Sequence, residues 1–254
     1  VQFYKWAWRN EHIDNLPRNL DSPELKWSRY RRRRQEPTEI QIFSNTELHT
    51  IISNAYDSGK WCDLRLFILL GINCGMTPID IGNIRWNQIT KANGNYYLEQ
   101  TRSKTGVKGK WLLWDETIRY FNQRFGSIDH QSNDLIFITQ QGRKLNRVMD
   151  AEPERFANFD DITAISNTTL TRRFSRLIRR TYPDQDHYLS FKYLRKTGAT
   201  LISHLDINNA DRIAQIYLRH SLSSVADRHY VQPQFESLSA ALAKLGAELG
   251  FHKV

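Results

Sequence analysis

The spacing of apolar residues along the chain predicts helices over most of its length. The clearest helix starts at Ser44, because Ser44 and Glu47 have the spacing of a capping box and apolar residues follow at helical intervals. These apolar residues are Leu48, Ile51, Ile52 and Ala55. Further helices are predicted over about 61–73, 115–125, 170–178 and 210–218. We therefore expect a mainly α-helical chain.

A short helix is predicted after Thr77, where residues suited to a helix start follow one another. Thr77 can cap the helix, Pro78 suits its first position because no N–H donor is needed there, and Asp80 completes a box-like arrangement. The apolar face of this helix is expected to include Ile79, Ile84 and Trp86.

Another helix is predicted after Ser190, which can act as its cap. Lys192 and Arg195 are three residues apart and so share one face near the start of this helix. The residues expected to face the interior are Leu194, Leu201, Ile202 and Leu205.

The C-terminal segment carries an apolar stripe at helical spacing. Its members are Phe235, Leu238, Ala241, Leu242, Leu245 and Leu249. A helix with this stripe either packs on its own domain or docks on a neighbour, and the sequence leaves both arrangements open.

Alternating apolar and polar residues predict two strands, over 96–102 and 110–114, which residues 103–109 connect. A short extended segment is also predicted over 135–139. The predicted fold class is therefore mainly α with a small antiparallel β-sheet, that is, α+β.

The composition is that of a basic globular protein. The chain has 254 residues, of which 40% are hydrophobic, so it can bury a substantial core. Lys and Arg number 36 against 27 Asp and Glu, which gives a net charge of +9 and a pI of about 9.6. This charge favours a polyanionic partner such as nucleic acid over an acidic small molecule.

The two cysteines, Cys62 and Cys74, lie in one apolar helical run and are interpreted as small buried hydrophobic residues, not as a disulfide or metal site. A reducing, cytoplasmic setting fits this usage. The longest apolar run, over 64–74, is interrupted by Arg65 and Asn73 and is too short to cross a bilayer, so we expect no membrane segment.

The chain is expected to contain more than one structural part. Residues 1–28 are too few to bury a core and are interpreted as the end of a preceding domain. The arginine-rich segment 29–38 is interpreted as a basic linker, which either is a solvated tether or touches a phosphate backbone. The main domain is expected over 39–254. Because the chain begins at Val1 and not at Met, we expect it to be part of a longer protein.

Candidate chemistry is concentrated in residues 190–230, which hold a pair of cations, an imidazole and the phenol of Tyr230. A protein hydroxyl can attack a phosphodiester while cations hold the phosphate. Each group also has a simpler interpretation, because a Lys-x-x-Arg pair is usually a solvated face and a lone tyrosine is usually in the core. No metal is expected, because Asp184, Asp186 and His187 are interpreted as a polar turn and not as a set of metal ligands.

In the order of its motifs, the chain resembles the catalytic domain of the tyrosine recombinases, the phage-integrase family, over about 39–249. The four matching segments are Cys74-Gly75-Met76-Thr77-x-x-Asp80, Ser103-Lys104-Thr105-Gly106, Lys192-Tyr193-Leu194-Arg195, and Leu218-Arg219-His220-Ser221 followed by Tyr230. Under this resemblance, residues 1–28 are the end of a core-binding domain.

The resemblance implies a site-specific DNA recombinase or integrase of a mobile element. Tyr230 would attack a DNA phosphodiester to form a 3′-phosphotyrosine, and Lys104 would protonate the leaving 5′-oxygen. Arg195 and His220 would stabilise charge on the non-bridging oxygens, and Lys192 stands where other members carry histidine. The implied partners are double-stranded DNA and further protomers, and neither a cofactor nor a metal is implied.

The sequence departs from the family pattern at Thr77, where the family has its first catalytic arginine. Loss of such a cation typically costs about 3 kcal/mol of transition-state stabilisation, or about two decades of rate. Two residues are nominated to supply the missing charge: Arg219, which replaces the family's glycine beside His220, and Arg102 on the hairpin.

A second departure is the spacing from His220 to Tyr230, which is one residue longer than the commonest in the family. This spacing puts His229 at the usual position of the nucleophile. Since His229 has no hydroxyl, Tyr230 is still the expected nucleophile.

Basic residues of the helix near 170–178 are expected to extend the DNA-binding surface. The three nominated residues are Arg172, Arg173 and Arg176. Two other functions stay open. One is a catalytically degenerate, DNA-binding protein with the integrase fold, and the other is an unrelated basic helical protein that binds nucleic acid.

Overall fold

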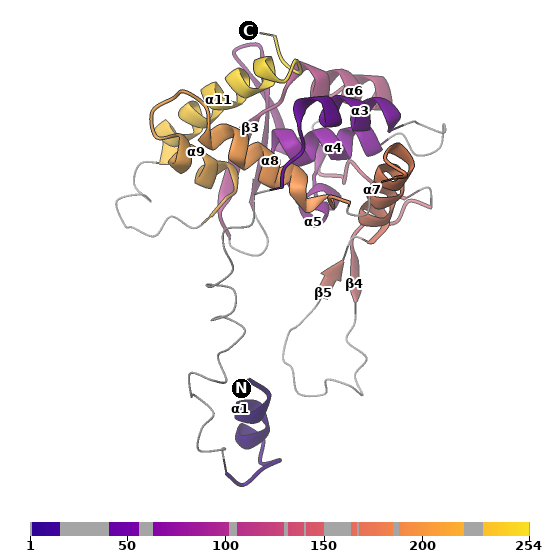
Figure 1. Cartoon of the computed structure of the whole chain (residues 1–254), viewed down its shortest axis with the longest axis vertical. Coiled ribbons are helices and arrows are strands. Elements are labelled where there is room, and N and C mark those ends of the chain that lie inside the picture. Colours follow the sequence, from indigo (N-terminus) through magenta and orange to yellow (C-terminus); the bar gives the residue numbers. More distant parts are fainter. Residues whose placement is uncertain are drawn as a thin grey trace. The chain divides into compact units, whose positions relative to one another are not determined.

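In the computed structural model shown in Figure 1, the described residues are 2–15, 41–55, 63–101, 106–129, 132–139, 141–149, 164–166, 168–184, 188–220 and 231–253. Contacts between residues divide the chain into two units, Val1–Gln41 and Ile42–Val254. The first unit contains the helix α1 (Gln2–Arg9), and its Trp6 and His12 rings lie 5.1 Å apart. The second unit contains all the other described elements.

The second unit is mainly α with a small antiparallel sheet, as the sequence predicts. Its helices are α3 (Asn45–Asn54), α4 (Leu64–Asn73), α5 (Pro78–Gly82), α6 (Asp115–Phe125), α7 (Thr168–Thr181), α8 (Lys192–Ser203), α9 (Ala210–Tyr217) and α11 (Val231–Glu248), with the 3-10 turn η2 (Trp86–Gln88). Its strands are β1 (Ile89–Ala92), β2 (Asn95–Thr101), β3 (Lys108–Leu112), β4 (Arg147–Met149) and β5 (Ala164–Ser166).

Local capping chemistry sets the starts of two predicted helices. The Ser44 hydroxyl accepts a hydrogen bond from the Glu47 N–H at 3.2 Å, and the Glu47 carboxylate accepts from the Ser44 N–H at 2.7 Å. Thr77 and Asp80 form the same reciprocal box at the start of α5. Both capping predictions are confirmed, because each depends only on residues three positions apart.

Two predictions about helices are wrong. Ser190 does not cap α8, because Phe191 occupies the cap position without a side-chain bond, while the Ser190 carbonyl accepts from the Tyr193 N–H at 2.9 Å. The helix α5 ends at Gly82, so Ile84 and Trp86 are not on its face. Both of these residues are buried beyond it, and Trp86 starts the turn η2.

The main sheet is an antiparallel meander in the order β1-β2-β3. The pairs Tyr97–Leu112 and Thr101–Lys108 set the register of the predicted β2-β3 hairpin. The strand β1 was not predicted, although Asn93-Gly94 between β1 and β2 is a two-residue hairpin signal, and both of these residues have positive φ. The segment 135–139, predicted to be extended, forms only isolated bridges.

The helix α4 lies at the centre of the second unit (Figure 1) and is buried on nearly all sides. It packs against α8, α6, α7 and α5. A Cβ at Gly71 of α4 would lie 3.0 Å from the side chains of Phe191 and Leu194, so this glycine permits the close contact with α8. The residue that follows α4, Cys74, is buried and unpaired, whereas Cys62 lies outside the described residues.

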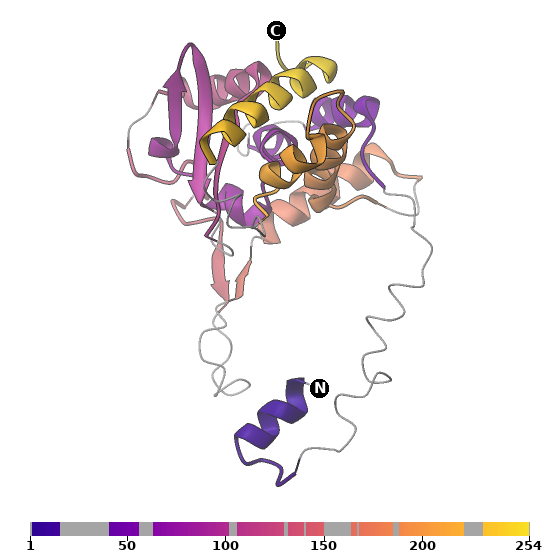
Figure 2. The ribbon, with the colours of Figure 1, turned by 90° about the vertical axis from the view of Figure 1, so that its left-hand side faces the viewer.

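The C-terminal helix α11 packs on its own unit. Figure 2 shows it between the main sheet and α9, and it packs against β3, α9 and α8. The Trp114 indole donates a 2.7 Å hydrogen bond to the Leu242 carbonyl of α11. Of the two arrangements left open by the sequence, the structure has the helix docked within the same chain.

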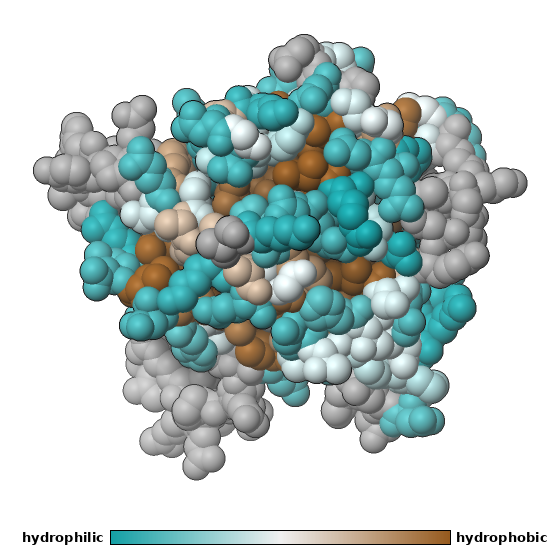
Figure 3. Space-filling view, turned by 90° about the horizontal axis from the view of Figure 1, so that it is seen from above, coloured by the Kyte–Doolittle hydropathy of each residue, from teal (hydrophilic) through white to brown (hydrophobic). Residues whose placement is uncertain are grey.

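Seen from above, the surface is mostly hydrophilic and shows several separate apolar patches (Figure 3). Within the described part of the chain, the large apolar side chains with high exposure are Tyr4, Trp8 and Ile138. None of the described helices has both the length and the apolar character needed to span a membrane.

Candidate active site

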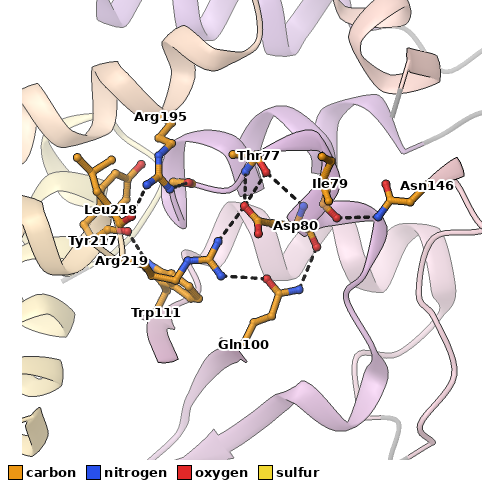
Figure 4. Close-up of polar contacts among 11 residues, drawn as sticks. Thr77, Ile79, Asp80, Gln100, Trp111, Asn146, Arg195, Tyr217, Leu218 and Arg219 are labelled. Carbon is orange, nitrogen blue, oxygen red and sulfur yellow. Dashed lines mark hydrogen bonds and ion pairs between the residues drawn. The ribbon is translucent and has the colours of Figure 1, made fainter. Parts of the chain in front are cut away.

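The side chain of Arg195 joins three segments that are far apart in the sequence (Figure 4). Its guanidinium donates hydrogen bonds to the carbonyl oxygens of Gly75 and Leu218, and the side chain is half-buried. Gly75 belongs to the segment that leads into α5, Arg195 lies on α8, and Leu218 directly precedes Arg219 and His220. One cation therefore brings together three of the four motifs identified in the sequence.

Tyr217 is the buried side chain around which these segments close. Its hydroxyl donates a 2.7 Å hydrogen bond to the Ile72 carbonyl near the end of α4. A Cβ at Gly75 would lie 2.8 Å from the Tyr217 ring, and a Cβ at Gly198 would lie 2.1 Å from its hydroxyl oxygen. The two glycines are thus required for Arg195 and the Gly75 segment to approach α9.

The Tyr217 phenol is not suited to act as a nucleophile. Burial raises the pKa of Tyr217 strongly, and the opposing effect of the Arg195 guanidinium is smaller. A phenol that is fully enclosed, donates its proton to a carbonyl and resists ionisation has a structural role. Tyr217 is therefore not a candidate nucleophile, although it lies close to Arg195.

Asp80 is the acceptor at the centre of a second cluster (Figure 4). One of its carboxylate oxygens accepts from the Thr77 N–H at 2.9 Å and from the Thr77 hydroxyl at 2.7 Å, and lies 2.8 Å from the Arg219 guanidinium. The Asp80 carbonyl accepts from the Gln100 amide at 2.9 Å, and the Gln100 oxygen accepts from Arg219 at 3.3 Å. The start of α5, the strand β2 and the turn after α9 therefore meet in one polar cluster.

Arg219, one of the two residues nominated to replace the missing arginine, lies in this cluster beside Thr77. Its side chain is completely buried, and its guanidinium lies over the Trp111 ring at 4.9 Å from the ring centre. A fully buried side chain does not reach a phosphate in this conformation, so the placement does not support the DNA-binding role expected of Arg219, which stays a prediction. The physical reason is the buried carboxylate of Asp80, which attracts the guanidinium into the interior.

The cations expected to face DNA differ in exposure. His220 and Lys192 are both exposed, and Arg195 is half-buried. The ammonium of Lys192 lies 5.3 Å from the centre of the Tyr193 ring, and that of Lys196 lies 4.7 Å from the same ring. The start of α8 thus carries two ammonium groups at one aromatic ring.

Three of the nominated residues lie outside the described part of the chain: Tyr230, Lys104 and Arg102. The flanking elements limit where they attach. Lys104 and Arg102 belong to the connection between Thr101 of β2 and Gly106, and Tyr230 directly precedes α11. Their geometry at the site therefore stays a prediction.

The arginines of α7 are not equivalent. Arg172 and Arg176 are exposed, whereas Arg173 is half-buried near Asp63. Burial lowers the pKa of the Arg173 guanidinium, and the nearby Asp63 carboxylate opposes that shift. Two of the three nominated arginines are therefore on the solvent side of α7, and the third faces a carboxylate.

Sequence reasoning missed Gln100, Trp111 and Gly109, which complete the Arg219 cluster. A Cβ at Gly109 would lie 2.2 Å from the Trp111 ring and 2.9 Å from the Arg219 side chain. A glycine inside a strand can mark such a close approach, so Gly109 was the available signal. Among the described residues, no group of three or more His, Cys, Asp and Glu side chains could hold a metal ion.

No model of a known protein family matches the sequence, and no curated protein matches it. Solved structures do match. A lambda integrase dimer bound to a COC′ core site has a TM-score of 0.53 and is 20% identical, over 89% of this chain and 55% of that chain. A lambda integrase tetramer bound to a Holliday junction has a TM-score of 0.52 and is 19% identical, over 87% of this chain and 56% of that one.

A third match is the XerH site-specific recombinase in a post-cleavage complex with a palindromic difH substrate. Its TM-score is 0.54 and its identity 18%, over 80% of this chain and 53% of that chain. The chain thus spans about half the length of each of these three matched chains. The likeness is one of fold: the chain folds as a tyrosine-recombinase catalytic domain, mainly α with a small antiparallel sheet.

Proposed function

We propose that the chain is the catalytic part of a site-specific DNA recombinase or integrase, which cleaves and rejoins DNA through a 3′-phosphotyrosine intermediate. One observation carries the proposal. The Arg195 guanidinium is bonded to the carbonyls of Gly75 and Leu218, so motifs from three distant segments meet at one cation. A phosphoryl transition state depends on positioning and fixed positive charge, so the convergence of these segments on Arg195 supports the proposal.

In the proposed reaction, the Tyr230 hydroxyl oxygen attacks the scissile phosphorus and the bond from phosphorus to the 5′-oxygen breaks. Lys104 gives a proton to the leaving 5′-oxygen, and the phenolic proton of Tyr230 passes to water, from which Lys104 is reprotonated. Arg195, His220 and Lys192 stabilise the charge on the non-bridging oxygens. The phosphotyrosine ester conserves the energy of the broken bond, so the reverse attack by a 5′-hydroxyl rejoins DNA without a cofactor.

The partners proposed for this chain are double-stranded DNA and further copies of itself on DNA, in the cytoplasm. The net charge of +9 supports a polyanionic partner. The matched lambda integrase structures are a dimer and a tetramer on DNA, which supports assembly of several protomers. Residues 1–28 are proposed to end a core-binding domain, 29–38 to form a basic linker, and 39–254 to form the catalytic domain.

A second candidate function is DNA binding without cleavage. Thr77 cannot neutralise a phosphate, and the guanidinium beside it belongs to the buried Arg219, bound to Asp80. A site that lacks one transition-state cation loses about two decades of rate.

A nicked, suicide-type DNA substrate separates the two functions, because the cleaved strand diffuses away and traps the covalent complex. The recombinase is expected to give a protein–DNA band that survives denaturation and disappears in Tyr230→Phe. Tyr188→Phe is a matched control, since the exposed hydrogen bond of that hydroxyl to the Pro183 carbonyl, at 3.3 Å, lies outside the site. A gel shift on the cognate site with no covalent band would instead establish the DNA-binding protein.

A further inference from the structure

Arg219 is a charged side chain in the protein interior, and a gain in stability does not by itself explain its presence there. Its side chain is fully buried and its guanidinium lies 2.8 Å from the Asp80 carboxylate. Removing both charges from water carries a large desolvation penalty, so a buried pair is weak evidence of stabilisation. A buried pair does, however, fix the relative position of the segments that carry it.

The backbone at Arg219 adds to the case that this side chain has a specific role. Arg219 has a φ of +50°, in the left-handed region that favours glycine. The turn would be relaxed with glycine at this position, yet the chain carries a long cationic side chain there. The opposite strand makes room for it, because a Cβ at Gly109 would lie 2.9 Å from the Arg219 side chain.

The contacts of Arg219 reach both strands of the hairpin that leads to Lys104. Gln100 of β2 accepts a hydrogen bond from Arg219 at 3.3 Å, and Trp111 of β3 lies under its guanidinium. The third contact is Asp80 at the start of α5. The same arginine directly precedes His220, so one side chain connects the base of the hairpin to the turn that carries the imidazole.

We propose that Arg219 is a positioning residue, which holds the hairpin so that Lys104 reaches the leaving 5′-oxygen of a phosphate bound by Arg195 and His220. This role rests on the proposed recombinase function. The residue does not touch DNA; it acts through Gln100, Trp111 and Asp80.

The test compares covalent-complex formation on two nicked substrates, one with the natural 5′-oxygen and one with sulfur in its place at the scissile bond. A 5′-thiolate leaves without a proton, so it does not need Lys104. The main variant is Arg219→Met with Asp80→Asn, which removes both charges and leaves no buried charge unpaired. The matched control is Arg124→Met with Asp63→Asn, a pair 2.9 Å apart at the opposite end of α4 from Gly75.

We expect the Arg219 and Asp80 pair variant to bind DNA as the wild type does and to lose at least about tenfold in cleavage rate on the oxygen substrate. The sulfur substrate should recover most of that loss, as it should for Lys104→Ala. The control pair should cleave both substrates like the wild type. If the pair variant does not fold, Arg219→Lys is tested in its place, because an ammonium cannot bond Asp80 and Gln100 with the same planar fork. The cleavage rate that Arg219→Lys loses on the oxygen substrate must also be recovered on the sulfur substrate.

Equal losses on both substrates, or no loss in any Arg219 variant of an active enzyme, would overturn the positioning role and leave the recombinase function intact. If the wild type forms no covalent complex on either substrate at its cognate site, the recombinase function fails and the positioning role fails with it.

Discussion

The Tyr217 hydroxyl and the Ile72 carbonyl form a 2.7 Å hydrogen bond that joins the end of α9 to the end of α4. Carbonyls in the last turn of a helix have no partner within the helix, so a side chain from another helix satisfies this one. The same phenol fills the space left by Gly75 and Gly198. The candidate site is therefore built on a buried contact between two helices.

Replacing Tyr217 by phenylalanine should destabilise the protein by about 1–3 kcal/mol, because a buried carbonyl loses its donor. The free energy of unfolding in urea measures the effect. Tyr188→Phe is the control and should change stability by less than about 0.5 kcal/mol, since its hydroxyl bond is exposed. Equal effects of the two changes would contradict the structural role given to Tyr217.

A second prediction concerns Asn73, the buried polar residue at the end of α4. Its amide donates to the Leu112 carbonyl at 2.8 Å, and its oxygen accepts from the Trp114 N–H at 2.9 Å and the Thr117 hydroxyl at 3.1 Å. Asn73→Leu keeps the number and branching of side-chain heavy atoms and removes all three bonds, so a loss of about 3 kcal/mol or more is expected.

The comparison for Asn73 is Asn122→Leu, on the exposed side of α6, which should change stability by less than about 0.5 kcal/mol. Chemical denaturation of both variants decides. A loss below about 1 kcal/mol for Asn73→Leu would mean that these three bonds do not hold the hairpin and α6 to α4.

Local signals predicted the parts of this fold that depend on nearby residues. The capping boxes at Ser44 and Thr77 and the bounds of α6 could be predicted because three-residue spacings and apolar periodicity determine them. Ser190 shows the limit: a residue suited to a cap is not used when the chain already turns helical at Phe191.

The geometry of the candidate site depended on contacts that no local pattern contains. The residues Arg219 and Asp80 are 139 positions apart in the numbering, and the burial of both follows from the packing of α5, the hairpin and α9. Sequence reasoning could pair the lost arginine at Thr77 with the gained Arg219. It could not show that the guanidinium would be enclosed, because enclosure depends on Gly109 and Trp111 from a third segment.

A third prediction is a pH dependence from Asp63, which packs against Arg124 and lies near Arg173. Burial raises the pKa of Asp63 above its ordinary value of 3.8, and the charges of Arg124 and Arg173 oppose the rise. The folded state therefore keeps the proton at pH values where the unfolded chain has lost it. Stability from this group is present at low pH and is lost as the pH rises above 3.8 through the folded-state pKa.

Urea unfolding of the wild type and Asp63→Asn across acidic pH measures this effect. The wild type should lose stability relative to the variant as the pH rises above 3.8, because only the wild type carries the carboxyl. A constant difference would show that the ion pair with Arg124 cancels the effect of burial, and a difference of opposite sign would show that it outweighs burial.

The last prediction separates the arginines of α7 by what they face. Arg172 and Arg176 are exposed, so each alanine variant should lower the slope of log affinity against log salt for duplex DNA by about 1. Arg173 is half-buried near Asp63, so its alanine variant should reduce stability and leave the slope unchanged.

Fluorescence anisotropy with a labelled duplex, titrated at several salt concentrations, gives these slopes. Arg119→Ala is the control, because Arg119 is exposed on α6 but is paired with Glu116 and should not alter the slope. A lower slope in Arg173→Ala with unchanged stability would place the DNA on the opposite side of α7. Unchanged slopes in both Arg172→Ala and Arg176→Ala would show that α7 is not part of the DNA interface. A variant that has lost a phosphate contact releases fewer counterions when it binds DNA, so its slope must be smaller.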